Sequence, residues 1–145
     1  MGTQPVLGHE DAATAVETIR HELARRGKTA VIAVADAHGE LVALLRMDGA
    51  PLSSIAVATN KAWTAARLRR PTRVLGAGVR AKGIDIGYYG DPRLTGFGGG
   101  VPVWAAAQVA GAIAVSALSD DEDEALALQA VAALASRGYA AEPVA

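Results

Sequence analysis

Two cations and an acid surround the junction between a strand-like run and a helix-like run. Arg46 ends the apolar run, Asp48 lies in the turn that follows, and Lys61 lies on the helix expected after Pro51. A strand end, a turn and a helix can bring these side chains to one rim, where the cations would hold the carboxylates of a buried ligand. Asp48 could cap the helix or orient either cation. The alternative is a partly buried salt bridge that only closes the turn.

A second group of chemically capable residues lies in a glycine-rich stretch. Beyond one turn of helix, Val74 to Gly90 is predicted to be a long loop that carries Tyr88 and Tyr89. A long structured loop often lines a binding site. Either tyrosine could stack on a planar ligand, give an oxygen ligand to heme iron, or anchor its own loop.

Three consecutive glycines, Gly98, Gly99 and Gly100, follow the run from Leu94 to Phe97. Glycine lets backbone approach a neighbour closely and exposes amide donors. The spacing is neither that of a Walker loop nor that of a dinucleotide fingerprint, because the Lys-Ser/Thr ending and the strand-turn-helix context are missing. We therefore expect a bulged strand that begins at Leu94, on a pocket wall or a subunit contact.

One histidine lies on the first expected helix, from His9 to Arg26. The apolar stripe of that helix includes Val16, Ile19 and Leu23, and His21 falls outside it, beside acidic and basic residues. A solvated surface histidine is the simplest interpretation. A heme ligand or a subunit contact is the alternative.

The helix that carries Lys61 has an unusual first half. It begins near Pro51, where no backbone donor is needed. No charged residue occurs between Pro51 and Asn60, so we expect this half to be covered by the fold, by a partner or by a ligand. The apolar and small residues that recur at helical spacing are Leu52, Ile55, Thr59, Ala62, Trp63 and Ala66.

Two hairpins and a closing helix complete the chain. Thr29 to Ala35 should pair with Glu40 to Met47, and Val101 to Trp104 with Gln108 to Ser116. A capping box, S-D-D-E at 119–122, starts the last helix. These elements predict an α+β domain with one mostly antiparallel sheet that carries helices.

Composition excludes several classes of protein. A chain of 145 residues fits one domain, 1–145, with its core at about 9–138. The net charge of −1 argues against nucleic-acid partners and anionic membranes, and the absence of cysteine excludes disulfides and thiolate chemistry. Residues 1–8 show no leader and no run is long enough to cross a membrane, so we expect a cytoplasmic protein. No metal site is predicted, because consecutive helical carboxylates point in different directions.

Several of these motifs together resemble the GlcG/HbpS family, also called the heme-degrading domain family. The residues concerned are AVADAHGELVALLRMDGAPLSSIAVATNKAWTAA at 33–66, RPT at 70–72, FGGGVPV at 97–103 and VAGAIAVS at 109–116. The resemblance implies a profilin-like sheet of about five strands, and homo-oligomers built from dimers. It also implies a heme-binding or heme-degrading role.

The resemblance places a pocket between the Pro51 helix, residues 74–93 and the FGGGVP strand, with Arg46 and Lys61 near the heme propionates. The chain departs from the family where alanine or leucine replaces glycine, at Ala106-Ala107 and at 114–118, and these side chains fill space that glycine leaves open. The expected ligand-binding residues are Arg46, Lys61, Ile55, Trp63, Phe97, Gly98, Gly99 and Gly100.

Three functions follow as hypotheses. The first is binding, with or without degradation, of heme or another planar hydrophobic ligand that bears carboxylates. The second is a cofactor-independent enzyme acting on a hydrophobic small molecule, with Lys61, Asp48, Tyr88 and Tyr89 as the catalytic groups. The third is a non-catalytic oligomeric accessory protein, which the alanine-rich surfaces favour.

Overall fold

The structure is a computed structural model that describes residues 5–145. Its elements are α1 (His9–Arg26), β1 (Val31–Asp36), β2 (Leu41–Arg46), α2 (Ser53–Leu68), α3 (Thr72–Lys82), η1 (Ile86–Tyr89), β3 (Gly100–Ala105), β4 (Gln108–Ser116), α4 (Asp120–Ala133), η2 (Ala135–Arg137) and β5 (Tyr139–Ala140). The strands form one antiparallel sheet in the order β2-β1-β4-β3-β5. The α+β, profilin-like class predicted from the sequence is confirmed.

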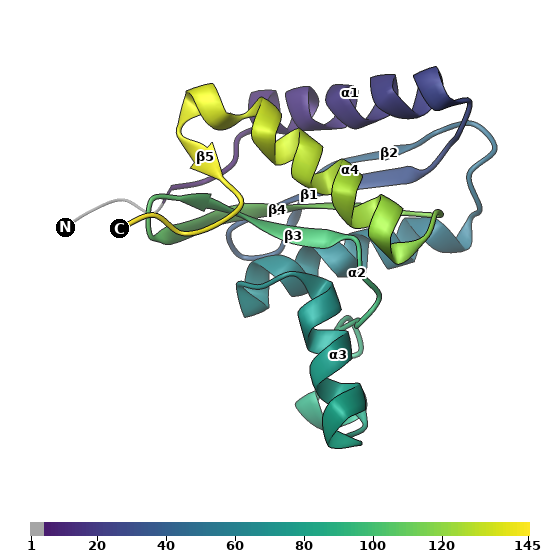
Figure 1. The fold of residues 1–145 in the computed structure, drawn as a ribbon, viewed down its shortest axis with the longest axis vertical. Coiled ribbons are helices and arrows are strands. Elements are labelled where there is room, and N and C mark those ends of the chain that lie inside the picture. Colours follow the sequence, from purple (N-terminus) through teal and green to yellow (C-terminus); the bar gives the residue numbers. More distant parts are fainter. Residues whose placement is uncertain (1–4) are drawn as a thin grey trace.

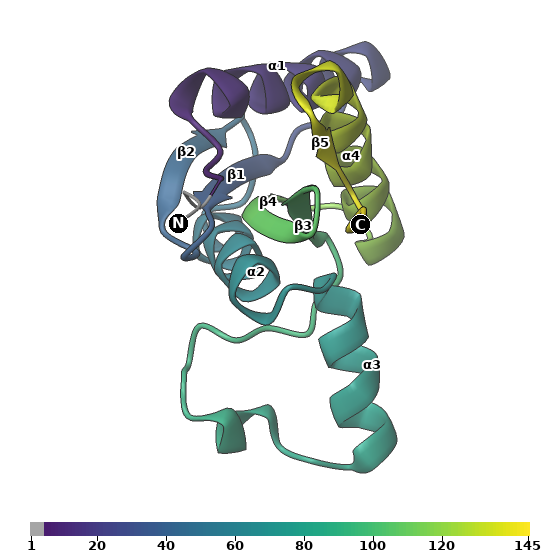
Figure 2. The same cartoon turned by 90° about the vertical axis from the view of Figure 1, so that its left-hand side faces the viewer.

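Helices cover both faces of this sheet. The helices α1 and α4 lie on one face and α2 lies on the other (Figure 1). Beyond α2, the helix α3 and the segment that returns from it extend away from the sheet (Figure 2). The molecule is therefore a three-layered body with an arm that the sheet does not support.

Both predicted hairpins are confirmed. In the first, Val31 pairs with Arg46 and Val34 with Ala43. The Asp36 carboxylate closes the turn, because its Oδ1 accepts from the His38 amide at 2.8 Å and from the Glu40 amide at 3.1 Å. The strand β1 also pairs with β4, which places the N-terminal hairpin beside the C-terminal one.

The two faces of the sheet have different cores. Large side chains fill the layer between the sheet and the helices α1 and α4, among them Ile19, Leu23, Ile113 and Leu126. The layer beneath α2 consists largely of alanine, from both the helix and the strands β1 and β4. Small side chains let two backbones approach closely, so α2 lies tight against the sheet.

The fold itself covers only part of the first half of α2, and cover of the rest by a partner or a ligand stays a prediction. The side chain of Leu52 is 70% exposed, and Ser53 and Ala56 are also exposed. Only Ser54 and Ala58 are buried in this half. The absence of charge there does not reflect a fully buried helix face.

The predicted loop at 74–90 is also wrong, because α3 continues from Thr72 to Lys82. Two glycines lie inside this helix, and Gly76 has a packing role. A Cβ on Gly76 would lie 2.2 Å from the carbonyl oxygen of Gly96, so only glycine lets the returning segment touch the helix. Tertiary packing thus overrides the low helix propensity of glycine.

The strand predicted to begin at Leu94 begins instead at Gly100. Residues 94–99 pack against the helices as an irregular segment. The Thr64 hydroxyl donates to the Arg93 carbonyl and accepts from the Thr95 amide, both at 3.2 Å. These bonds to α2 replace the ladder bonds of a strand.

No helix within residues 5–145 has both the length and the apolar character needed to cross a bilayer. The expectation about a leader in residues 1–8 falls partly on residues 1–4, which lie outside the described part of the chain.

The two glycines of α3 give a matched test of the packing between this helix and the segment that returns from it. Gly76→Ala forces a methyl group into the Gly96 carbonyl and should destabilise the fold by about 1–3 kcal/mol. Gly78 has open space around it, so Gly78→Ala should stabilise by roughly 0.5–1 kcal/mol through helix propensity. Urea unfolding of both variants measures the difference, and equal effects would contradict this packing.

Asp11 at the start of α1 should make the free energy of unfolding fall at low pH. Burial raises the pKa of Asp11, but hydrogen bonds from Arg137, from the Gly8 amide and from Tyr139 outweigh it and leave the pKa below 3.8. A carboxylate with a lowered folded-state pKa stabilises above pH 3.8, and this stabilisation is lost as the pH falls through the folded-state value. Asp11→Asn should therefore flatten the acid limb of the stability curve, measured by urea unfolding at each pH.

The control is Glu10→Gln, which removes an exposed charge from the same helical turn. The acid limb should keep its wild-type slope in that variant. An unchanged slope in Asp11→Asn would contradict the role of Asp11.

Candidate functional site

Lys61 forms a buried ion pair with Asp123. Its side chain is 2% exposed and that of Asp123 is 1% exposed. The Lys61 Nζ donates to the Val115 carbonyl at 2.9 Å and to Asp123 Oδ2 at 3.2 Å. The Leu118 amide donates to Asp123 Oδ1 at 3.2 Å. One lysine of α2 therefore joins the end of β4 to the start of α4.

The neighbouring glycines make room for this pair. A Cβ on Gly99, whose φ is +129°, would lie 2.8 Å from the Lys61 Nζ, and a Cβ on Gly100 would lie 2.6 Å from the Lys61 carbonyl oxygen. The Thr72 hydroxyl accepts from the Gly100 amide at 3.1 Å, and this bond holds the start of β3 against the start of α3. The predicted close approach of this backbone has a specific partner, which is Lys61 itself.

Asp123 is the important residue that the sequence alone did not single out. It belongs to the acidic first turn of α4, where Ser119 forms the predicted cap by accepting from the Glu122 amide at 3.2 Å. Four consecutive acids explain a helix start, and nothing in their order marks the one that faces inward. Burial raises the pKa of the Asp123 carboxyl, and the Lys61 ammonium opposes this shift.

A hollow of about 350 Å³ opens beside the ion pair. Its walls come from the first half of α2, the end of β4, the first turn of α4 and Phe97. The polar residues that line it are Ser53, Ser54, Lys61, Ser116, Asp120 and Asp123, and the apolar ones include Val57, Phe97 and Leu118.

Arg46 and Asp48 do not share a rim with Lys61, contrary to the expectation from the sequence. They line a separate hollow of about 300 Å³ together with Arg20 and Thr29. The strand β2 is an edge of the sheet, whereas Lys61 contacts β4, which lies two strands away. The intervening strand β1 keeps the two cations apart.

The other expected site residues are dispersed. Tyr88 is 84% exposed and Tyr89 is exposed as well, both on the arm. Ile55 packs against the alanine layer. Two guanidinium groups lie over the ring of Trp63, with Arg93 at 4.1 Å and Arg67 at 4.9 Å from the ring centre. The four groups expected to be catalytic thus do not meet in one hollow.

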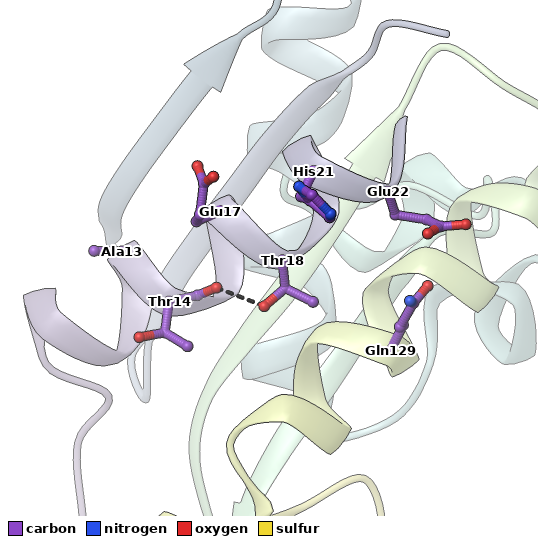
Figure 3. A pocket seen from close by; sticks show the side chains of 7 residues that line it. All are labelled: Ala13, Thr14, Glu17, Thr18, His21, Glu22 and Gln129. Carbon is purple, nitrogen blue, oxygen red and sulfur yellow. Dashed lines mark hydrogen bonds between the residues drawn. The ribbon is translucent and has the colours of Figure 1, made fainter. Parts of the chain in front are cut away.

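His21 lies in a third hollow, a groove of about 640 Å³ between α1 and α4. Figure 3 shows His21 and Thr18 on α1, with Gln129 facing them from α4. The Thr18 hydroxyl is engaged, because it donates to the Thr14 carbonyl at 2.8 Å. The imidazole of His21 is exposed and makes no hydrogen bond to any other residue between 5 and 145.

Comparison with known proteins shows where this arrangement belongs. The family model described as "Haem degrading protein HbpS-like" matches residues 7–132. The chain belongs to the HbpS-like family. Protein GlcG of Escherichia coli (strain K12) is 34% identical over 116 residues, which are 80% of this chain and 85% of GlcG. The resemblance inferred from the sequence motifs is therefore confirmed.

Solved structures of HbpS-like proteins share the fold. The Streptomyces reticuli HbpS double mutant matches with a TM-score of 0.83 and 29% identity, over 92% of this chain and 90% of that chain. A PduOC:heme complex matches with a TM-score of 0.81 and 27% identity, over 88% of this chain and 94% of that chain. One structural relative of this HbpS-like chain has thus been crystallised with heme.

The ion pair of this HbpS-like protein gives a double-mutant test. Lys61→Met leaves a buried carboxyl without its partner and should cost about 3–5 kcal/mol of stability, as should Asp123→Leu. The double variant should lose much less than the sum, because neither charge is left buried alone. Urea unfolding measures all four proteins, and strictly additive losses would contradict the pair.

The pH dependence of stability gives an independent test of the ion pair with the same variants. Because burial raises the pKa of Asp123, the orphaned carboxyl of Lys61→Met should take up a proton readily. The deficit of Lys61→Met relative to wild type should therefore shrink as the pH is lowered towards 4. A deficit that grows at acid pH would contradict this assignment.

Proposed function

We propose that this HbpS-like protein binds heme, or a similarly planar ligand with carboxylates, in the groove between α1 and α4, with His21 as the iron ligand. The observation that carries the proposal is an exposed imidazole, free of hydrogen bonds to residues 5–145, in a groove of about 640 Å³. The family description and the heme complex of a relative support heme as the first ligand to test.

The residues of the groove suit such a ligand. Imidazole nitrogen is a common axial ligand of heme iron, and a histidine without a competing hydrogen bond can turn a ring nitrogen outwards. Gln129 faces His21 across the groove and would offer an amide donor to a propionate oxygen of the ligand. When bound, heme would supply the redox and oxygen chemistry that these side chains lack.

The groove itself is lined by the carboxylates of Glu17 and Glu22, so the propionates would need the arginines that lie beside it on α1. Arg20 pairs with Glu17, and Arg25 and Arg26 pair with Glu22. Hydrogen bonds from Arg25 and Arg26 lower the pKa of Glu22 to about 2, so it stays ionised. The ion pair between Arg20 and Glu17 is exposed, and such pairs contribute little, so Arg20 could exchange Glu17 for a propionate at small cost.

Because the groove is open, a ligand bound there could be covered by a second copy of the chain. A planar ligand on this surface would contact α1 and α4 with one face and would leave much of the other face in water. Burying that second apolar face would stabilise the complex, and a second copy of the chain can supply the cover. The proposed homo-oligomer would thus depend on ligand.

A hemin titration with matched histidine variants tests the proposal. The wild-type protein should shift the Soret band with a saturable curve, and His21→Ala should weaken binding by about tenfold or more through loss of the iron ligand. His38→Ala is the control, because His38 is exposed in the turn between β1 and β2 and should leave the titration unchanged. Identical curves for His21→Ala and wild type would refute His21 as the ligand.

A further inference from the structure

The hollow beside Lys61 contains polar groups that the fold does not use. Ser54 is 6% exposed and Ser116 is 5% exposed, and neither hydroxyl forms a hydrogen bond with another residue in the described range 5–145. Lys61 has three N–H donors, and the Val115 carbonyl and Asp123 account for two of them. Neither hydroxyl belongs to the fully buried polar atoms that lack a partner in the described chain, so both open onto the hollow and are available to a ligand.

The start of α2 adds to this excess of donors. Its first turn has no acidic residue and no side-chain cap, whereas the first turn of α4 has four acids and the Ser119 cap. No side chain of the helix's own first turn therefore compensates the positive end of α2. Ser54, Val57 and Lys61 follow at spacings of three and four and so lie on one face of the helix, which lines the hollow.

We propose that this hollow binds a small monocarboxylate. The carboxylate would accept from the Ser54 and Ser116 hydroxyls and from the remaining N–H of Lys61, near the positive end of α2. The short carbon chain would lie against Val57 and Leu118. Asp120 is exposed at the rim and repels every negative charge brought near it, so a dicarboxylate, which brings two, should bind more weakly than a monocarboxylate.

This site is independent of the proposed heme groove. The two hollows have no lining residue in common, since one uses α2, β4 and the first turn of α4, and the other uses α1 and Gln129. Hemin binding should therefore survive the loss of both serines, and carboxylate binding should survive His21→Ala.

An NMR titration with acetate and with its neutral analogue acetamide, followed through the backbone amide chemical shifts, tests whether the hollow binds a carboxylate. Acetate should produce saturable shifts in residues 53–57 and 116–118, with a Kd on the order of millimolar. Acetamide at equal ionic strength should bind at least about tenfold more weakly, because it lacks the charge. Succinate should also bind more weakly than acetate.

The variants keep the proposal falsifiable. Ser54→Ala and Ser116→Ala should each weaken acetate binding by about tenfold, and Ser136→Ala on exposed η2 should not. The melting temperatures and the hemin titrations of these variants establish that the fold is intact. Linear shifts without saturation, equal binding by the double serine variant, or shifts centred on Arg46 would overturn the proposal.

Discussion

The ion pair between Lys61 and Asp123 is the interaction on which the arrangement of this chain depends. A charge buried at this depth costs several kcal/mol unless a partner and hydrogen bonds compensate it. The compensation comes from three elements that are distant in sequence, namely α2, the end of β4 and the start of α4. The pair therefore fixes the position of α4 relative to the sheet.

Other unusual features follow from accommodating this pair. Gly99 and Gly100 have no side chain because Lys61 occupies that space. Ala117, in the turn that leads from β4 to Asp123, has a φ of +125°, a strained conformation for a residue with a Cβ. Asp123 is thus brought to Lys61 at the expense of local backbone strain, of the kind that is common beside binding sites.

The two proposed sites depend on the same placement of α4. Its first turn walls the hollow beside Lys61, and Gln129, farther along, faces His21 across the groove. Arg46 and Asp48 lie outside this unit, at the edge strand β2. In the described chain, the polar chemistry is therefore distributed over both helical layers and is not concentrated in one pocket.

Local patterns were sufficient to predict the elements that local physics controls. The two hairpins, the first helix from His9 to Arg26 and the Ser119 cap depend on turn chemistry and periodicity, and all are confirmed. The errors arose where distant contacts decide. The glycines of α3 suggested a loop because the contact with Gly96 is invisible in sequence. The charge-free half of α2 indicated a covered face, but the sequence could not tell how much of that cover the sheet supplies.

The candidate site shows the same limit. Lys61 was singled out as a cation on an apolar helix, but its partner was assumed to be nearby in sequence, and Asp123 lies 62 positions away. The role of His21 as a ligand remains a prediction, because its position on the helix indicates only that it faces outwards.

Amine labelling of the native protein tests the central claim most directly. A bulky acylating reagent followed by peptide mass spectrometry should modify Lys28 and Lys82, which are exposed, and leave Lys61 unmodified until the protein is unfolded. Labelling of Lys61 at the rate of Lys28 in the native state would contradict the buried ion pair and the architecture built around it.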